Sequence, residues 1–136
     1  MKPSFAVLVF AFLAPNLGAA DLPLDLQAKF IKIILTHTQS AGKVAIKDVG
    51  MIAKLAELGV VADSGAKVAY AGSESEMTAF KGKLIICPKL ELLPKGGSIG
   101  LVEEGGKPII YLHMVNMYAS GVPVSPTLLK IVKEFK

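Results

Sequence analysis

Residues 43–59, KVAIKDVGMIAKLAELG, decide the fold class, because a strand pattern changes into a helical pattern within them. Lys43–Lys47 is a short apolar run bounded by lysines, which predicts a strand. From Val49 to Leu58 the apolar residues recur at helical spacing, and Gly59 stands where a C-terminal cap is expected. A strand followed at once by an amphipathic helix is a building unit of α/β proteins.

The same alternation continues toward the C-terminus. Two further apolar runs, Lys67–Ala71 and Lys83–Cys87, predict strands, and a helix is expected to open between them. Ser98–Val102 and Pro108–His113 predict two more strands, and the five residues between them include two glycines. Such a gap indicates an antiparallel hairpin.

Helical patterns flank these strands at both ends of the chain. Pro23 and Asp25 suit the first turn of a helix over Asp21–Thr38. Another helix is expected over Met114–Ser120, and a last one runs from Pro126 toward the C-terminus. The prediction is therefore α/β: a single three-layer domain, with a mostly parallel central sheet, a C-terminal antiparallel hairpin and helices on both faces.

The predicted first helix is apolar around more than one side. Leu26, Phe30 and Ile33 belong to one stripe, and Ile31 and Leu35 widen it beyond that stripe. Such a helix is either wedged between two layers or offers its spare face to a partner.

Residues 1–20 have the three regions of a secretory signal peptide. Lys2 gives a positive start, Phe5–Ala14 is an uncharged apolar run, and Leu17–Ala20 ends in small residues. Cleavage is expected after Ala20, which makes 21–136 the folded domain. A buried N-terminal helix and an uncleaved anchor are the alternatives, but the apolar run is about half the length that spans a bilayer.

Composition argues against a nucleic-acid-binding protein. All 15 basic residues are lysine, tryptophan is absent, and the net charge is only +4. Arginine supplies the planar fork that binds phosphate, so its absence makes nucleic acid an unexpected partner. Cys87 is the single cysteine. It is expected to be a buried strand residue, and a dimer-linking or reactive thiol is the alternative.

The sequence contains no recognisable catalytic motif. His37 and His113 are far apart and neither has a neighbouring ligand residue, so both are expected at the ends of elements. No metal, cofactor or catalytic residue is predicted, and the chain is not expected to be an enzyme.

The tail NMYASGVPVSPTLLK, residues 116–130, resembles the closing motif of the YfiR-like family of small periplasmic regulators. In that family an Asn follows the last strand, and Ala, Gly, an aliphatic-Ser pair and Leu-Leu come next. The Gly96-Gly97 pair resembles the family's entry to its penultimate strand, and residues 28–33 are similar to its opening helix. The matching positions of the motif are Gly97, Asn116, Ala119, Gly121, Ser125, Leu128 and Leu129.

The resemblance implies a periplasmic binding protein that represses a membrane-bound diguanylate cyclase by contacting its periplasmic sensor domain. A different membrane sensor is a related possibility for the partner, and homodimerisation is another expected contact. Phe30, Ile31 and Leu35 are the residues predicted to form the partner or dimer surface, whereas Asn116 and Ser125 are expected to cap and pin the C-terminal helices. The alternative function is a periplasmic small-ligand-binding domain that serves a transporter or a sensor kinase.

Overall fold

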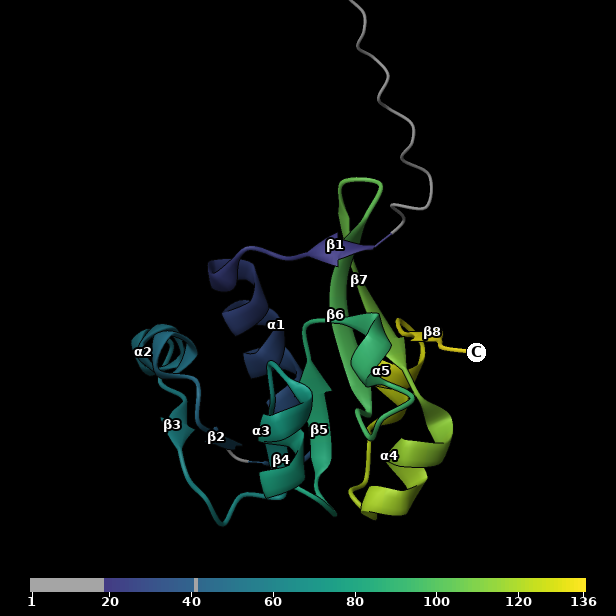
Figure 1. The fold of residues 1–136 in the computed structure, drawn as a ribbon. Coiled ribbons are helices and arrows are strands. Elements are labelled where there is room, and N and C mark those ends of the chain that lie inside the picture. The colour runs from purple at the N-terminus through teal and green to yellow at the C-terminus, as the bar shows by residue number, and fades with distance from the viewer. Residues whose placement is uncertain (1–18, 41) are drawn as a thin grey trace, which may run out of the picture.

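The computed structural model describes residues 19–40 and 42–136, and its strands form one mixed sheet (Figure 1). The strands are β1 (Ala20–Asp21), β2 (Lys43–Ile46), β3 (Val61–Ala62), β4 (Val68–Tyr70), β5 (Leu84–Cys87), β6 (Ile99–Glu104), β7 (Lys107–Leu112) and β8 (Lys133–Glu134). Their order is β3-β2-β4-β5-β6-β7-β8, parallel from β3 to β6, and β7 runs antiparallel to β6. The predicted mostly parallel sheet with a C-terminal hairpin is confirmed.

Helices cover both faces of this sheet. One face carries α1 (Leu24–His37), α2 (Val49–Glu57) and α5 (Pro126–Leu129). Met117 of α4 (Met114–Ser120) also packs into the core on this face. The other face carries α3 (Glu74–Ala79) and the single-turn 3₁₀ helix η3 (Leu90–Leu92). These elements make the three layers that the alternation of strands and helices predicts.

At β2 and β4 the two faces of the sheet bury side chains of different size. Val44, Val68 and Leu84 point toward α1 and α2, whereas Ala45 and Ala69 point toward α3. This division follows from strand geometry, in which successive side chains point to opposite faces.

The N-terminal segment differs from the prediction, because Asp21 lies in a strand and the first helix begins at Leu24. β1 pairs antiparallel with β6, with Ala20 opposite Glu103 and Asp21 opposite Val102. Pro23 explains the difference: its ψ of 148° is extended, and a proline disfavours helical backbone in the residue before it. Residues 1–18 of the predicted signal peptide lie outside the described residues.

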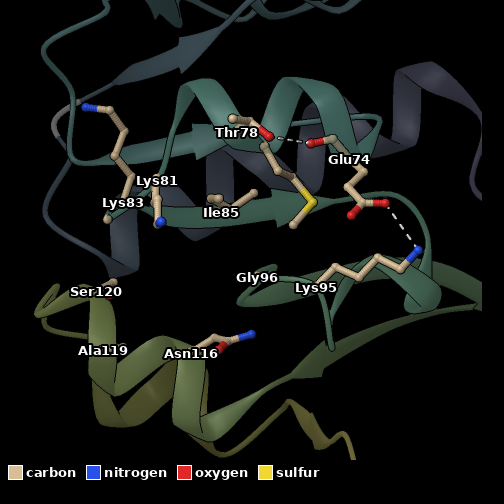
Figure 2. Close-up of a pocket in the computed structure, with 12 residues that line it drawn as sticks. Glu74, Thr78, Lys81, Lys83, Ile85, Lys95, Gly96, Asn116, Ala119 and Ser120 are labelled. Atoms are coloured by element: carbon tan, nitrogen blue, oxygen red, sulfur yellow. Dashed lines mark hydrogen bonds and ion pairs between the residues drawn. The ribbon is translucent and has the colours of Figure 1, made fainter.

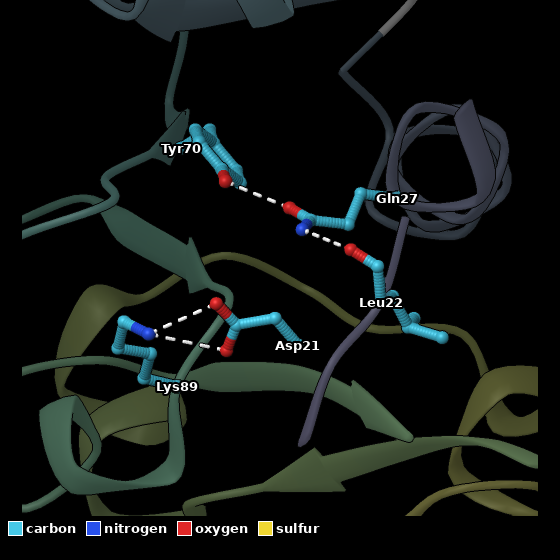
Figure 3. Close-up of polar contacts among 5 residues, drawn as sticks. All are labelled: Asp21, Leu22, Gln27, Tyr70 and Lys89. Carbon is cyan, nitrogen blue, oxygen red and sulfur yellow. Dashed lines mark hydrogen bonds and ion pairs between the residues drawn. The ribbon is translucent and has the colours of Figure 1, made fainter. Parts of the chain in front are cut away.

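Buried and exposed polar contacts hold this N-terminal segment (Figure 3). Leu22 is 3% exposed, and its carbonyl accepts a hydrogen bond of 2.8 Å from the Gln27 side chain. The hydroxyl of Tyr70 donates to the Gln27 amide oxygen at 2.8 Å, which links β4 to the start of α1. On the surface the Asp21 carboxylate lies 3.0 Å from the Lys89 ammonium. The segment is therefore part of the folded core on both sides of Pro23.

The C-terminal tail also differs from the prediction. The predicted last helix stops at Leu129, and Ile131, just beyond it, is 60% exposed. The chain then forms β8 beside the open edge of β7, where the Phe135 N–H donates to the Leu112 carbonyl. The Phe135 ring packs edge-on against Tyr111, with centroids 6.3 Å apart. An open sheet edge thus satisfies the tail's backbone in place of a longer helix.

The hairpin between β6 and β7 is tighter than predicted. The pairing extends to Glu104 and Lys107, so only Gly105 and Gly106 form the turn. Their φ values are +59° and +79°, as a two-residue turn that suits the strand twist requires.

Cys87 ends β5 and is fully buried, which confirms the prediction of a buried strand residue. Its thiol lies 3.5 Å from the Ile99 carbonyl oxygen and 3.6 Å from that of Lys89. Burial raises the pKa of the Cys87 thiol to about 12.

Stability should therefore fall in alkaline solution. The unfolded thiol has a pKa near 8.5, so above this pH the unfolded chain loses a proton that the folded chain keeps. We expect the free energy of unfolding to drop by about 1 kcal/mol between pH 9 and pH 10. Urea unfolding of Cys87→Ala across the same range is the control, and an equal drop in that variant would exclude the thiol as the source.

Candidate functional site

The predicted partner surface on α1 is wrong for two of its three residues. Ile31 and Leu35 are 0% and 1% exposed and pack in the core between α1 and the sheet. Burying such a side chain is worth about 1.5–3 kcal/mol, so neither is available to a partner in this fold. Phe30 is half-buried at the border of the core. For Ile31 and Leu35 the wedged alternative is the one realised.

A different set of apolar residues is accessible on α1. Leu26, Phe30 and Ile33 share one side of the helix, and Ile33 is 43% exposed. His37 continues this side, and its Nδ1 lies 2.8 Å from the Ser125 hydroxyl at the start of α5. We call Leu26, Phe30 and Ile33 the α1 stripe. It lies toward α5, away from the side on which Asp25 pairs with Lys54 of α2 at 2.8 Å.

Two residues of the family-like motif are brought together by the fold. The Asn116 side-chain amide donates to the carbonyls of Leu93 and Gly97, at 2.8 Å and 2.9 Å. Gly97 itself has no room for a side chain, because a Cβ there would lie 2.8 Å from the Cys87 sulfur. Asn116 thus fixes α4 to the loop before β6, which agrees with the pinning role expected for it.

The rest of the motif shapes the C-terminal helices. Gly121 ends α4 with a φ of +71°, a conformation that glycine adopts without strain. Ser125 caps α5 by accepting a hydrogen bond from the Leu128 N–H. Leu128 is buried, whereas Leu129 is 39% exposed and Ala119 lies on the surface of α4. His37 and His113 lie at helix ends, as predicted: His37 closes α1, and His113 caps α4.

A groove lies between α3 and α4 and has a volume of about 460 Å³ (Figure 2). Met77 and Ile85, both nearly buried, supply apolar surface from α3 and β5. Ala119 and Ser120 form the opposite side on α4. The remaining lining residues are Glu74, Thr78, Lys81, Gly82, Lys83, Lys95, Gly96 and Asn116.

The groove has three lysines and one carboxylate at its rim. The Lys83 ammonium donates to the carbonyls of Ala66 and Ser64, at 2.5 Å and 3.3 Å, and points away from α4 (Figure 2). Lys95 pairs with Glu74 at 3.2 Å. Among the described residues Lys81 makes no hydrogen bond or ion pair. Its ammonium faces the groove on the side of Ala119 and Ser120 (Figure 2).

The sequence did not reveal this groove. Its charged residues come from the start of α3, from the turn before β5 and from the loop after η3, and only the fold brings them together. Lysine-glycine pairs at Lys81-Gly82 and Lys95-Gly96 mark turns, but such pairs occur in many loops and do not indicate a site.

Within residues 19–40 and 42–136, no group of three or more His, Cys, Asp or Glu side chains is arranged to hold a metal ion. No helix there has the length and apolar character needed to cross a membrane.

Comparisons with known proteins show similarity in fold alone. No family model matches the chain, and no curated protein is significantly similar to it. One similar solved structure is a conserved domain protein from Vibrio cholerae O1 biovar eltor, with a TM-score of 0.60 and 12% sequence identity. The match covers 86% of this chain and 62% of the Vibrio cholerae chain, so the chain spans less than two thirds of that protein's length. Membership of the YfiR-like family stays a prediction.

Glycine at position 97 is expected to be required for stability. Gly97→Ala should lower the free energy of unfolding by about 1–3 kcal/mol, because the new methyl group overlaps the Cys87 sulfur and crowds the Leu92 carbonyl. Gly50→Ala in α2 is the matched control. Its Cβ meets nothing closer than 3.5 Å, so the helix propensity of alanine should raise stability by up to about 1 kcal/mol. Urea unfolding of both variants tests this, and equal stabilities would contradict the packing argument.

Proposed function

We propose that the protein is an exported regulatory binding domain that represses a membrane-bound diguanylate cyclase through the cyclase's periplasmic sensor domain. The proposal rests on the predicted signal peptide and on the resemblance of residues 116–130 to the YfiR-like family. The structural observation that supports it is the α1 stripe, an apolar surface on a long helix that is anchored in the core.

The α1 stripe is suited to a rigid contact. Ile31, Ile34 and Leu35 hold the other side of α1 against the sheet, so the helix does not have to become ordered when a partner binds. Two hydrogen bonds connect the end of α1 to the start of α5: the Ser125 N–H donates to the His37 carbonyl, and the His37 ring bonds to the Ser125 hydroxyl. A protein that binds the inactive conformation of the sensor better than the active one shifts the sensor toward inactivity. In this proposal, cyclic-di-GMP production falls although the regulator never meets the nucleotide.

The proposed cleavage after Ala20 is compatible with this fold. It would remove one residue of β1 and keep Asp21, with its ion pair to Lys89. It would also keep Leu22, whose side chain is buried and whose carbonyl bonds to Gln27. The processed chain would therefore retain the contacts that hold its N-terminus.

The α1 stripe is tested by one surface substitution in cells that lack the chromosomal gene. Deletion should raise cyclic-di-GMP, and the wild-type gene should restore the low level. Ile33→Asp should fail to restore it and should reduce recovery of the membrane partner in a pull-down by about tenfold, because a carboxylate replaces an apolar contact.

Val61→Asp is the matched control. Val61, like Ile33, is an exposed β-branched residue, at 60% accessibility, but it lies on β3 at the edge of the sheet. It should behave as the wild type. Circular dichroism melting of both variants checks that they fold. An Ile33→Asp protein that folds, binds and represses normally would overturn the α1 stripe as the contact surface, and an unchanged cyclic-di-GMP level after deletion would overturn the regulatory function.

The groove between α3 and α4 favours a second candidate function. A cavity of this size with apolar walls and a few charged groups is typical of small-molecule sites. In this alternative the protein is a periplasmic small-ligand-binding domain that serves a transporter or a sensor kinase.

A further inference from the structure

We propose that the groove between α3 and α4 binds a small monoanion with an aliphatic chain, of the class of the medium-chain carboxylates. The proposal rests on the second candidate function, because it names the ligand class of that groove. It does not depend on the α1 stripe, which lies on the other face of the sheet.

The apolar part of the ligand would lie on Met77 and Ile85. Both side chains belong to the core between α3 and the sheet, at 4% and 3% exposure, and show one side to the groove. Ala119 adds a methyl group from α4. The volume of about 460 Å³ falls within the range of about 300–1,000 Å³ that small-molecule sites occupy. The groove therefore has the space for an aliphatic chain, and Met77, Ile85 and Ala119 each add a small apolar patch to its lining.

The charged side chains of the groove favour a ligand that carries a single negative charge. Lys83 is engaged by two carbonyls and Lys95 by Glu74, so Lys81 is the ammonium left to meet a ligand among the described lining residues. A dianion such as a phosphate ester would bring a second negative charge for which the described lining residues offer no second free ammonium. The chain also has no arginine for bidentate phosphate binding. A carboxylate matches a single lysine better.

The two ends of the groove suit a ligand with one charged end. Lys81 stands at one end, and the Lys95–Glu74 pair stands at the other (Figure 2). A carboxylate at Lys81 directs an aliphatic chain along Met77 toward this pair. The pair is exposed on both sides and of low energetic weight, so it can separate as the chain enters.

The walls of the groove are already in place. Asn116 bonds to the Leu93 and Gly97 carbonyls and so holds the loop that contains Gly96. A Cβ on Gly96 would lie 3.2 Å from the Met77 methyl group, which shows how closely this loop approaches α3. The Ser120 hydroxyl donates to the Met117 carbonyl at 2.6 Å and fixes the end of α4. A preformed site loses less entropy on binding.

The test is a titration of the ¹⁵N-labelled protein, in the form that is isolated from the producing cells. Binding is monitored by ¹H–¹⁵N NMR spectra at pH 7. The probes are octanoate, octylammonium and acetate, which vary the charge and the chain separately. Octanoate should shift the amide signals of Met77, Lys81 and Ala119 and bind at least about tenfold more tightly than either other probe. Tighter binding of octylammonium, or no shift of these signals with octanoate, would overturn the proposal.

Variants locate the two parts of the ligand. Lys81→Gln should weaken octanoate binding about three- to tenfold through loss of the charge-assisted contact. Ala119→Phe should abolish binding by filling the groove from the surface of α4, where it disturbs no core contact. Lys107→Gln, on the exposed start of β7, is the control and should bind as the wild type does.

The outcomes also separate this proposal from the function on which it rests. Octanoate binding that Lys81→Gln leaves unchanged overturns the ligand orientation and with it the proposal. Tighter binding of octylammonium than of octanoate at the same signals overturns the anion class but leaves a small-ligand function in place. Loss of repression in Ile33→Asp bears only on the α1 stripe.

Discussion

A mostly parallel sheet must be covered by an apolar layer on each face, and this constraint governs the rest of the structure. Strands β2 and β4 supply large side chains to the α1 face and alanines to the α3 face, which also buries Ile85, Val102 and Tyr111 of the later strands. The core on the α1 face buries Ile31, Ile34 and Leu35 of the first helix. Ile33 of the α1 stripe, which is 43% exposed, remains accessible to a partner.

The layer that contains α3 is incomplete. α3 is short, and the start of β5 with the turn before it lines the space between α3 and α4. The groove occupies this place, and the Asn116 contacts set the position of its α4 wall. The same motif that suggests the family thus contributes to a cavity whose charged residues lie elsewhere. The two proposed surfaces are on opposite faces and can be tested independently.

Much of the fold was predictable from local patterns. The apolar runs at Lys43–Lys47 and Lys83–Cys87 became β2 and β5, and Gly59 and Ser125 cap helices as expected. The short strands β1, β3 and β8 were not predicted, because two residues carry no periodicity and are defined by the neighbour with which they pair. The candidate groove was not predicted either, since Lys81, Lys95 and Asn116 are distant in sequence.

The sequence by itself determined the type and order of the main elements, because alternation, helical spacing, glycine and proline act over a few neighbouring residues. It also predicted a buried Cys87, which the structure confirms, and an export signal, which stays a prediction. Only the tertiary structure decided which side of α1 is accessible, that the tail ends as an edge strand, and that a lysine-rimmed groove exists. Periodicity marks a helix face as apolar, but whether a sheet, another helix or solvent meets that face depends on residues far away in the chain.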